Sequence, residues 1–100
     1  MATSKEFIEY VCERVSPFWA VHAKKMFGEY MVYIDAKPIL LVCDNTVFIK
    51  KFPELVGIMD GADCGFPYSG AKEHYILDPD DECRLSAAID ALLFLTPEKK

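Results

Sequence analysis

Cysteine and histidine are the residue types of this chain that could supply a nucleophile or a metal ligand. The four cysteines are unevenly spaced and form no C-x-x-C pair: Cys12, Cys43, Cys64 and Cys83. This spacing fits neither a disulfide framework nor a zinc motif, so we expect four reduced thiols. Cys64 alone lies in a polar stretch, and its acidic neighbours Asp60 and Asp63 oppose the electropositive setting that a nucleophilic cysteine needs.

Residues that could bind a metal ion or a phosphate group do not follow a known ligand pattern. His22 and His74 have no partner at i, i+4, and a metal site would require both of them to meet Cys64 in space. The acidic run at 78–82 does not have calcium-loop spacing and is interpreted as the start of a helix. The glycines form no phosphate loop. The sequence therefore predicts a protein that is not an enzyme, without catalytic residues, metal site or cofactor.

Lysines and aromatic residues are interleaved through the middle of the chain, and they are the candidate binding residues. The set is Lys24, Lys25, Phe27, Gly28, Tyr30, Tyr33, Tyr68, Lys72 and Tyr75, with Lys50 and Lys51 as further members. Such residues on neighbouring strands can contact phosphates and stack on bases. They can equally be the solvated face and the core face of one sheet, because side chains alternate along a strand. Both interpretations stay open from the sequence.

The elements that must position these residues begin with a helix. Thr3 and Glu6 have capping-box spacing, and apolar residues recur at helical spacing from residue 4 to residue 15, where Pro17 ends the helix. Strands are predicted at 21–27, 30–34, 39–43 and 46–51, with short connections that favour antiparallel neighbours. A brief helix follows Pro53, a strand precedes Asp78, and a final helix carries an apolar stripe from Leu85.

This order predicts one α+β domain over residues 1–100. The expected architecture has two layers, a mostly antiparallel curved sheet with the helices on one face, in the order α-β-β-β-β-α-β-α. The long apolar run at 39–43 suits a central strand, although an exposed edge near it would permit a homodimer.

Composition and net charge indicate the cell compartment of the protein and the class of its partner. The chain is 52% hydrophobic and carries a net charge of −5. It has no apolar run of membrane-spanning length and no signal-like start, so we expect a cytoplasmic protein that does not contact a membrane. A pI near 4.9 argues against strong autonomous binding to nucleic acid and is compatible with a protein partner.

One block of residues resembles a known family. The segment Lys25-Met26-Phe27-Gly28-x-Tyr30, followed by Tyr33, resembles the first strand pair of the TfoX N-terminal domain. The first helix, the hairpin around 41–50, the Pro67-Tyr68-x-Gly70 stretch with Lys72 and Tyr75, and the final helix are also similar to that domain. The similarity covers nearly the whole chain.

The resemblance implies a stand-alone copy of a regulatory domain from bacterial competence regulators, the TfoX or Sxy proteins. It implies a two-layer fold and an action through protein partners near the transcription machinery, such as the cyclic-AMP receptor protein or RNA polymerase. It brings no catalytic residues. The alternatives that the residues leave open are a small-ligand or nucleic-acid binding domain that uses the lysine–aromatic residues, and a thiol enzyme that uses Cys64.

Overall fold

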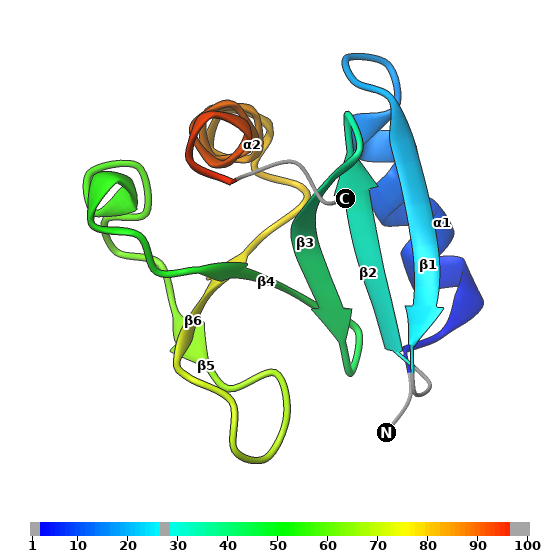
Figure 1. Ribbon diagram of the computed structural model, residues 1–100, viewed down its shortest axis with the longest axis horizontal. Coiled ribbons are helices and arrows are strands. Elements are labelled where there is room, and N and C mark those ends of the chain that lie inside the picture. The colour runs from blue at the N-terminus through cyan, green and yellow to red at the C-terminus, as the bar shows by residue number, and fades with distance from the viewer. Residues whose placement is uncertain (1–2, 27–28, 97–100) are drawn as a thin grey trace.

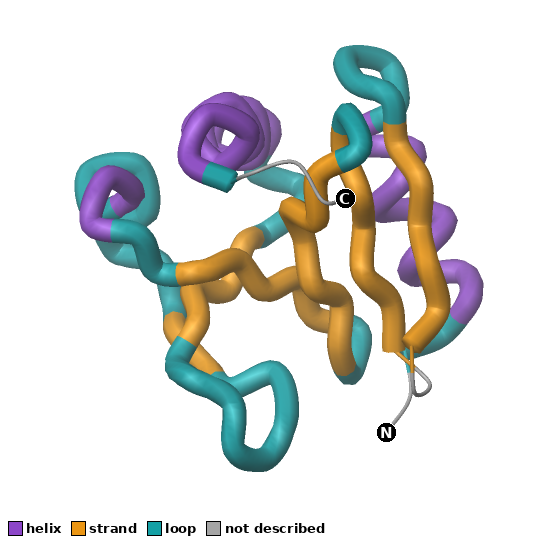
Figure 2. Tube along the Cα trace, viewed as in Figure 1, coloured by secondary structure: helices purple, strands orange, loops and turns teal. Residues whose placement is uncertain are grey.

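Six strands form one antiparallel sheet in the computed structural model, which describes residues 3–26 and 29–96 (Figures 1 and 2). Their order across the sheet is β1-β2-β3-β4-β6-β5. The strands are β1 (Val21–Met26), β2 (Glu29–Ile34), β3 (Lys37–Cys43), β4 (Thr46–Lys50), β5 (Cys64–Gly65) and β6 (His74–Leu77). The first four strands follow one another as a meander, as their short connections predict.

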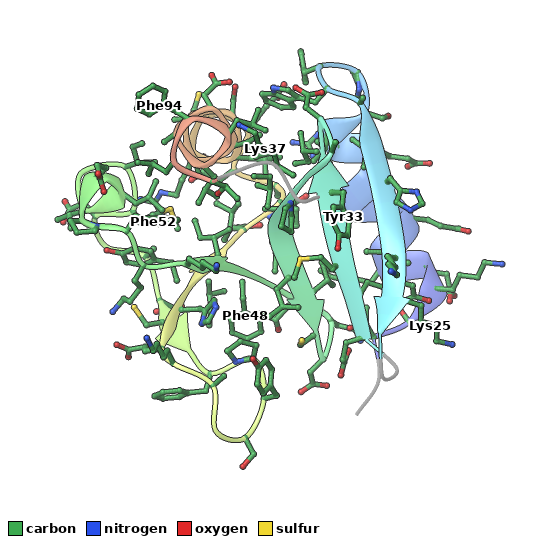
Figure 3. The ribbon with its side chains drawn as sticks, viewed as in Figure 1. Lys25, Tyr33, Lys37, Phe48, Phe52 and Phe94 are labelled. Carbon is green, nitrogen blue, oxygen red and sulfur yellow. The ribbon has the colours of Figure 1, made fainter. Side chains whose placement is uncertain are left out.

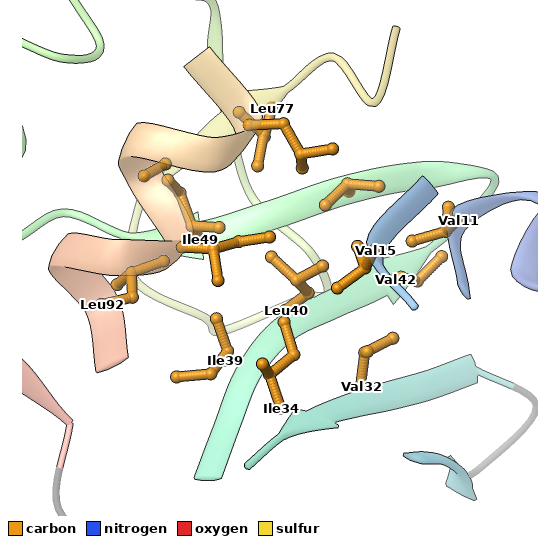
Figure 4. Close-up of a cluster of buried hydrophobic side chains, with 14 of the residues drawn as sticks. Val11, Val15, Val32, Ile34, Ile39, Leu40, Val42, Ile49, Leu77 and Leu92 are labelled. Atoms are coloured by element: carbon orange, nitrogen blue, oxygen red, sulfur yellow. The ribbon is translucent and has the colours of Figure 1, made fainter. Parts of the chain in front are cut away.

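Two helices pack on one face of the sheet and enclose a single hydrophobic core. They are α1 (Lys5–Val15) and α2 (Glu82–Leu95). The close-up in Figure 4 shows their side chains meeting those of β2, β3, β4 and β6 around Leu40 and Val42. Alternation selects the core residues on β2, since Val32 and Ile34 are fully buried whereas Met31 and Tyr33 are half-buried. The predicted α+β architecture is therefore confirmed.

The β2–β3 and β3–β4 hairpins have two-residue turns with left-handed backbone. Asp35 and Ala36 have φ of 52° and 69°, and Asp44 and Asn45 have φ of 51° and 54°. Two consecutive positive φ angles define the type I′ turn, whose twist matches that of the flanking strands. The short connection predicted between the strands at 39–43 and 46–51 is the Asp44-Asn45 turn, and the unfavourable left-handed Ala36 is held by the hairpin that it closes.

Strand β3 contains the main irregularity of the sheet. Val32 pairs with Leu40 and Tyr33 pairs with Pro38, so Ile39 is an extra residue in a β-bulge. Pro38 explains its place, because proline has no N–H to donate to a strand ladder. Residues 37–40 of β3 have no pairs with β4, because β4 turns away after Phe48 and continues beside β6 alone (Figure 1).

The capping box predicted at Thr3 and Glu6 is not formed at the N-terminus of α1. The N-cap is Ser4, whose hydroxyl accepts a hydrogen bond from the Phe7 N–H. Thr3 instead donates its hydroxyl and its N–H to the Glu29 carboxylate, at 2.6 and 3.0 Å. The shift by one residue follows from this tertiary contact. In the predicted capping box the Glu6 carboxylate would accept a hydrogen bond from the Thr3 N–H, but the Glu29 carboxylate accepts it instead.

Three further predictions about elements are corrected. The brief helix after Pro53 is a single 3-10 turn, η1 (Pro53–Leu55). Helix α2 begins at Glu82 rather than at Asp78, because Asp81 is the N-cap and accepts from the Arg84 N–H. The predicted strand before Asp78 is shortened to β6, and it pairs with the two-residue β5, which was not expected.

The edges of the sheet are β1 and β5. Strand β3 lies between β2 and β4, so its apolar run is central in the order of the sheet, with residues 41–43 paired to β4. Within the described residues, no helix has the length and apolar character that a membrane span requires.

Candidate functional site

The face of the sheet opposite α1 and α2 is covered by no helix among the described residues. Cross-strand pairing aligns one row of side chains across five strands of this face: Lys24, Met31, Leu41, Phe48 and Ile76. We call this side of the sheet the helix-free face. Figure 3 shows Tyr33 and Phe48 projecting from it.

Two further pairs of residues extend the helix-free face on either side of that row. His22 pairs with Tyr33 between β1 and β2, and their ring centroids are 6.2 Å apart. Lys50 pairs with His74 between β4 and β6. The His74 ring stands edge-on to Phe48 at 6.4 Å, and its Nδ1 donates to the Lys72 carbonyl oxygen at 2.7 Å. The second contact fixes the tautomer of His74, since a carbonyl oxygen only accepts.

A hollow of about 150 Å³ opens on this face where β3 and β4 diverge. Its inner lining is buried and comes from the bulge, from β4 and from the last turn of α2: Ile39, Phe48, Leu92 and Thr96. Its remaining lining is half-buried or exposed: Met31, Pro38, Leu41, Lys50, Tyr68 and His74. The hollow thus exists because α2 fills only the inner part of the gap that the diverging strands leave.

The size of this hollow decides what could enter it. Sites for drug-sized ligands and cofactors have volumes of about 300–1,000 Å³. A cavity of about 150 Å³ accommodates a molecule of the size of benzene. The hollow therefore matches one apolar or aromatic side chain, and it is too small for a nucleotide or an organic cofactor.

Part of the predicted lysine–aromatic set lies on the helix-free face. Lys24 is exposed and belongs to the central row. Tyr33 is half-buried beside His22. Tyr68, in the loop between β5 and β6, is 62% exposed at the rim of the hollow. Lys50 is also there, two residues after Phe48 at the end of β4.

The other part of the predicted set lies elsewhere. Lys25 pairs with Tyr30, and both have the register of the helix-covered face, where Tyr30 packs against the core. Tyr75 also packs against the core. Lys72 is exposed in the loop before β6. Alternation separates these residues from Lys24 and Tyr33, so the set does not form one surface.

Phe27 and Gly28 lie outside the described residues. The β-bulge in the described part of the chain is at Ile39.

The middle of the helix-free face is formed by Met31, Leu41 and Phe48. These three residues are not among the candidate binding residues predicted from the sequence. The signal was the alternation within the two apolar strands, in which every second residue must leave the core. Gly65 is a further member, because a Cβ there would lie 3.3 Å from both Phe48 Cε1 and Ile76 Cδ1. That glycine lets the edge strand β5 approach the two side chains.

Comparison with known proteins gives one relative, the "Uncharacterized 12.7 kDa protein in trpE 5'region" of Spirochaeta aurantia. It is 32% identical over 78 residues, which cover 78% of this chain and 68% of that protein. The chain belongs to the family of this spirochaete protein. No family model matches the chain, and no solved structure matches it.

Neither cysteines nor histidines of this family member come together as a reactive centre. All four cysteines are free thiols, of which Cys64 and Cys83 are exposed. Burial, followed by the charges of Glu29 and Asp44, raises the pKa of Cys43 to about 11, so this thiol stays protonated. Burial alone raises the pKa of Cys12.

Cys64 lies in an edge cluster with Lys51, Glu73 and Tyr75. The Lys51 ammonium is 2.8 Å from the Glu73 carboxylate and 5.1 Å from the centre of the Tyr75 ring. The hydrogen bond to Glu73 and, to a smaller extent, the neighbouring Cys64 raise the pKa of Lys51. Lys51 is therefore a cation already paired with a carboxylate, and no histidine in the described strands pairs with Cys64.

A metal centre is also not formed among the described residues, where no three histidine, cysteine or acidic side chains meet. His22 is on β1 and His74 on β6, with three strands between them. Cys64 pairs with Tyr75 and so has the register of the opposite face from His74.

Proposed function

We propose that this chain is a non-catalytic interaction domain that binds a protein partner through its helix-free face. The observation that carries the proposal is the hollow between β3 and β4, which opens on an aromatic and aliphatic surface and matches a single side chain in volume. Protein interfaces depend on a few apolar or aromatic anchors seated in such pockets.

The proposed class of domain is the TfoX N-terminal type. The K-M-F-G-x-Y block supports it, and so does the agreement between the architecture that this resemblance predicts and the observed sheet and helices. On this proposal the partner belongs to the transcription machinery of a bacterial cytoplasm, with the cyclic-AMP receptor protein and RNA polymerase as the first candidates. The net charge of −5 supports a protein rather than DNA as the direct contact.

The test is affinity capture of the tagged protein from its native lysate, with proteins and nucleic acids both identified. Lys24→Glu and Tyr68→Ala change exposed side chains of the helix-free face. Lys5→Glu, on the exposed side of α1, is the matched control. We expect a transcription protein that both face variants lose and the control retains, with all variants folded by circular dichroism. Equal capture by all three variants would contradict the proposal.

The second candidate is binding of a single-stranded nucleic acid, which the positions of Lys24 and Lys50 favour. Binding dominated by phosphate contacts weakens steeply as ionic strength rises. A titration of a labelled oligonucleotide at two salt concentrations separates the candidates. Tight binding that salt abolishes would favour the nucleic acid, and its absence favours the protein partner.

A further inference from the structure

Charge is distributed unequally between the two layers of this acidic protein. The six described strands contain a single acidic residue, Glu29, and its carboxylate is held at the end of β2 by Thr3 and by the Asp44 N–H. Acidic side chains are instead concentrated on the exposed sides of the helices and in the turn before α2: Glu6, Glu9, Glu13, Asp80, Asp81, Glu82 and Asp90.

The helix-free face consequently carries basic groups and little else that is charged. Lys24 and Lys50 are exposed there, and His22 and His74 lie beside them. Lys50 and His74 also line the hollow, so two of the basic groups border the anchor site directly. In a chain of net charge −5, this arrangement leaves the one face without a helix as the face that attracts an anion.

The burial of Phe48 favours a peptide over a nucleic acid as the anionic partner. Single-stranded nucleic acids are bound by aromatic rings whose flat faces are accessible to bases. Phe48 is only 6% exposed, because Gly65, Ile76 and His74 pack around its ring, so it forms the wall of a pocket and not a platform. The buried lining at Ile39 and Leu92 is aliphatic, which suits an apolar side chain better than a base.

We propose that the helix-free face binds an acidic peptide segment of its partner, with one aromatic or large apolar side chain seated in the hollow between β3 and β4. Acidic residues on either side of that anchor would lie over Lys50 and His74 at one end and over Lys24 at the other. This inference rests on the proposed function and specifies the chemistry of the partner.

The experiment is a titration of the 100-residue protein with a short synthetic peptide that has glutamates on both sides of a central tryptophan, followed by backbone amide NMR. Two matched peptides replace the tryptophan with alanine or all glutamates with lysine. We expect shift changes confined to β1, β2, β3, β4, β6 and the loop at 66–73. Loss of the anchor should weaken binding about thirtyfold or more, and the lysine peptide should not bind.

Protein variants test the same contacts from the other side. Lys24→Glu and Lys50→Glu should each weaken binding of the acidic peptide about three- to tenfold, and more at low salt. Lys5→Glu, which makes the same charge change on α1, should leave binding unchanged. Leu41→Phe fills the mouth of the hollow and should abolish the difference between the tryptophan and alanine peptides. An amide spectrum of each free variant establishes that it is folded.

Three outcomes would overturn this inference. The lysine peptide could bind as well as the acidic one, the shift changes could fall on α1 and α2, or an oligothymidylate could bind this face more tightly than the peptide. A captured partner that contacts the helix-free face through a basic segment would overturn the acidic-peptide inference and leave the proposed function intact. A partner that does not contact this face at all would overturn both.

Discussion

The two faces of the sheet are built from neighbouring residues and differ in what covers them. On β3, Leu40 is fully buried under the helices, whereas Leu41 is half-buried on the helix-free face. On β4, Val47 and Ile49 enter the core, and Phe48 between them lines the hollow. One face therefore holds the two layers together, and the other has an apolar surface that no helix of the described part of the chain covers.

Burial alone does not identify the core residues of this domain. Phe48 is almost as buried as the core residues, yet Gly65 and the rings of neighbouring strands bury it rather than a helix. Its surroundings are shallow, and a partner side chain could reach the same pocket. The strongest tests compare the effect of a substitution on one face with that of the same substitution on the other.

Leu40→Ala against Leu41→Ala gives the largest expected contrast. Removing the Leu40 side chain should lower the free energy of unfolding by about 2–5 kcal/mol, because it leaves a cavity at the centre of the core. Removing the half-buried Leu41 side chain should cost only about 1 kcal/mol. Chemical denaturation of both variants measures the difference. Equal losses would mean that the helix-free face is as tightly packed as the core.

Thiol labelling compares an interior residue with an edge residue. The pKa of Cys43 is raised to about 11, against an ordinary thiol pKa of about 8.5, so its thiolate is scarce at pH 8. We expect Cys43 to react with iodoacetamide roughly a hundredfold more slowly than the exposed Cys64. Mass spectrometry after timed quenching gives both rates. Labelling of Cys64 far faster than a free thiol would instead support the thiol-enzyme alternative.

The Glu29 network at the N-terminus of α1 should give a smaller effect that depends on pH. Burial acts to raise the pKa of Glu29, but the hydrogen bonds from Thr3 and from the Asp44 N–H outweigh it and lower the pKa. A carboxyl whose folded pKa is lowered stabilises the protein above its ordinary value of about 4.3 and loses this contribution as the pH falls further.

Glu29→Gln should therefore lower the free energy of unfolding by about 1 kcal/mol at pH 7 and flatten its decline below about pH 4. Denaturation midpoints from pH 7 to pH 3 measure this, with the exposed Glu9→Gln as the control. A parallel decline in the wild type and in Glu29→Gln would show that the network carries no part of the acid sensitivity.

The edge cluster should give the smallest effect. Lys51 bonds the exposed Glu73 carboxylate and lies over Tyr75, but exposed ion pairs contribute little. Lys51→Ala should leave the midpoint of chemical denaturation close to that of the wild type. A loss comparable with that of Leu40→Ala would mean that the edge of the sheet belongs to the core.

The fold follows from the sequence because its signals are local. The apolar periodicity of α1 and α2, the alternation along the strands and the Asp44-Asn45 turn all lie within short segments. The prediction of the capping box was wrong because it depended on a residue distant in sequence. Glu29 binds Thr3, and Ser4 is the N-cap instead.

The candidate site could be predicted only in part, because it depends on non-local geometry. Lys24 and Lys25 are adjacent in sequence, and their faces are fixed by pairing with Met31 and Tyr30. The hollow exists because β4 leaves β3 after Phe48, the partner of Leu41, and no local pattern indicates such a divergence. Lysines and tyrosines could be found from the sequence, but not the surface to which each belongs.

The most direct test of the central claim is site-specific photocrosslinking in the native cell. A photoreactive residue replaces Lys24 on the helix-free face or Glu13 on the exposed side of α1, and crosslinked products are identified by mass spectrometry. We predict that the probe at position 24 traps a defined protein partner and that the probe at position 13 does not. A partner trapped only from position 13 would contradict the assignment of the helix-free face as the binding surface.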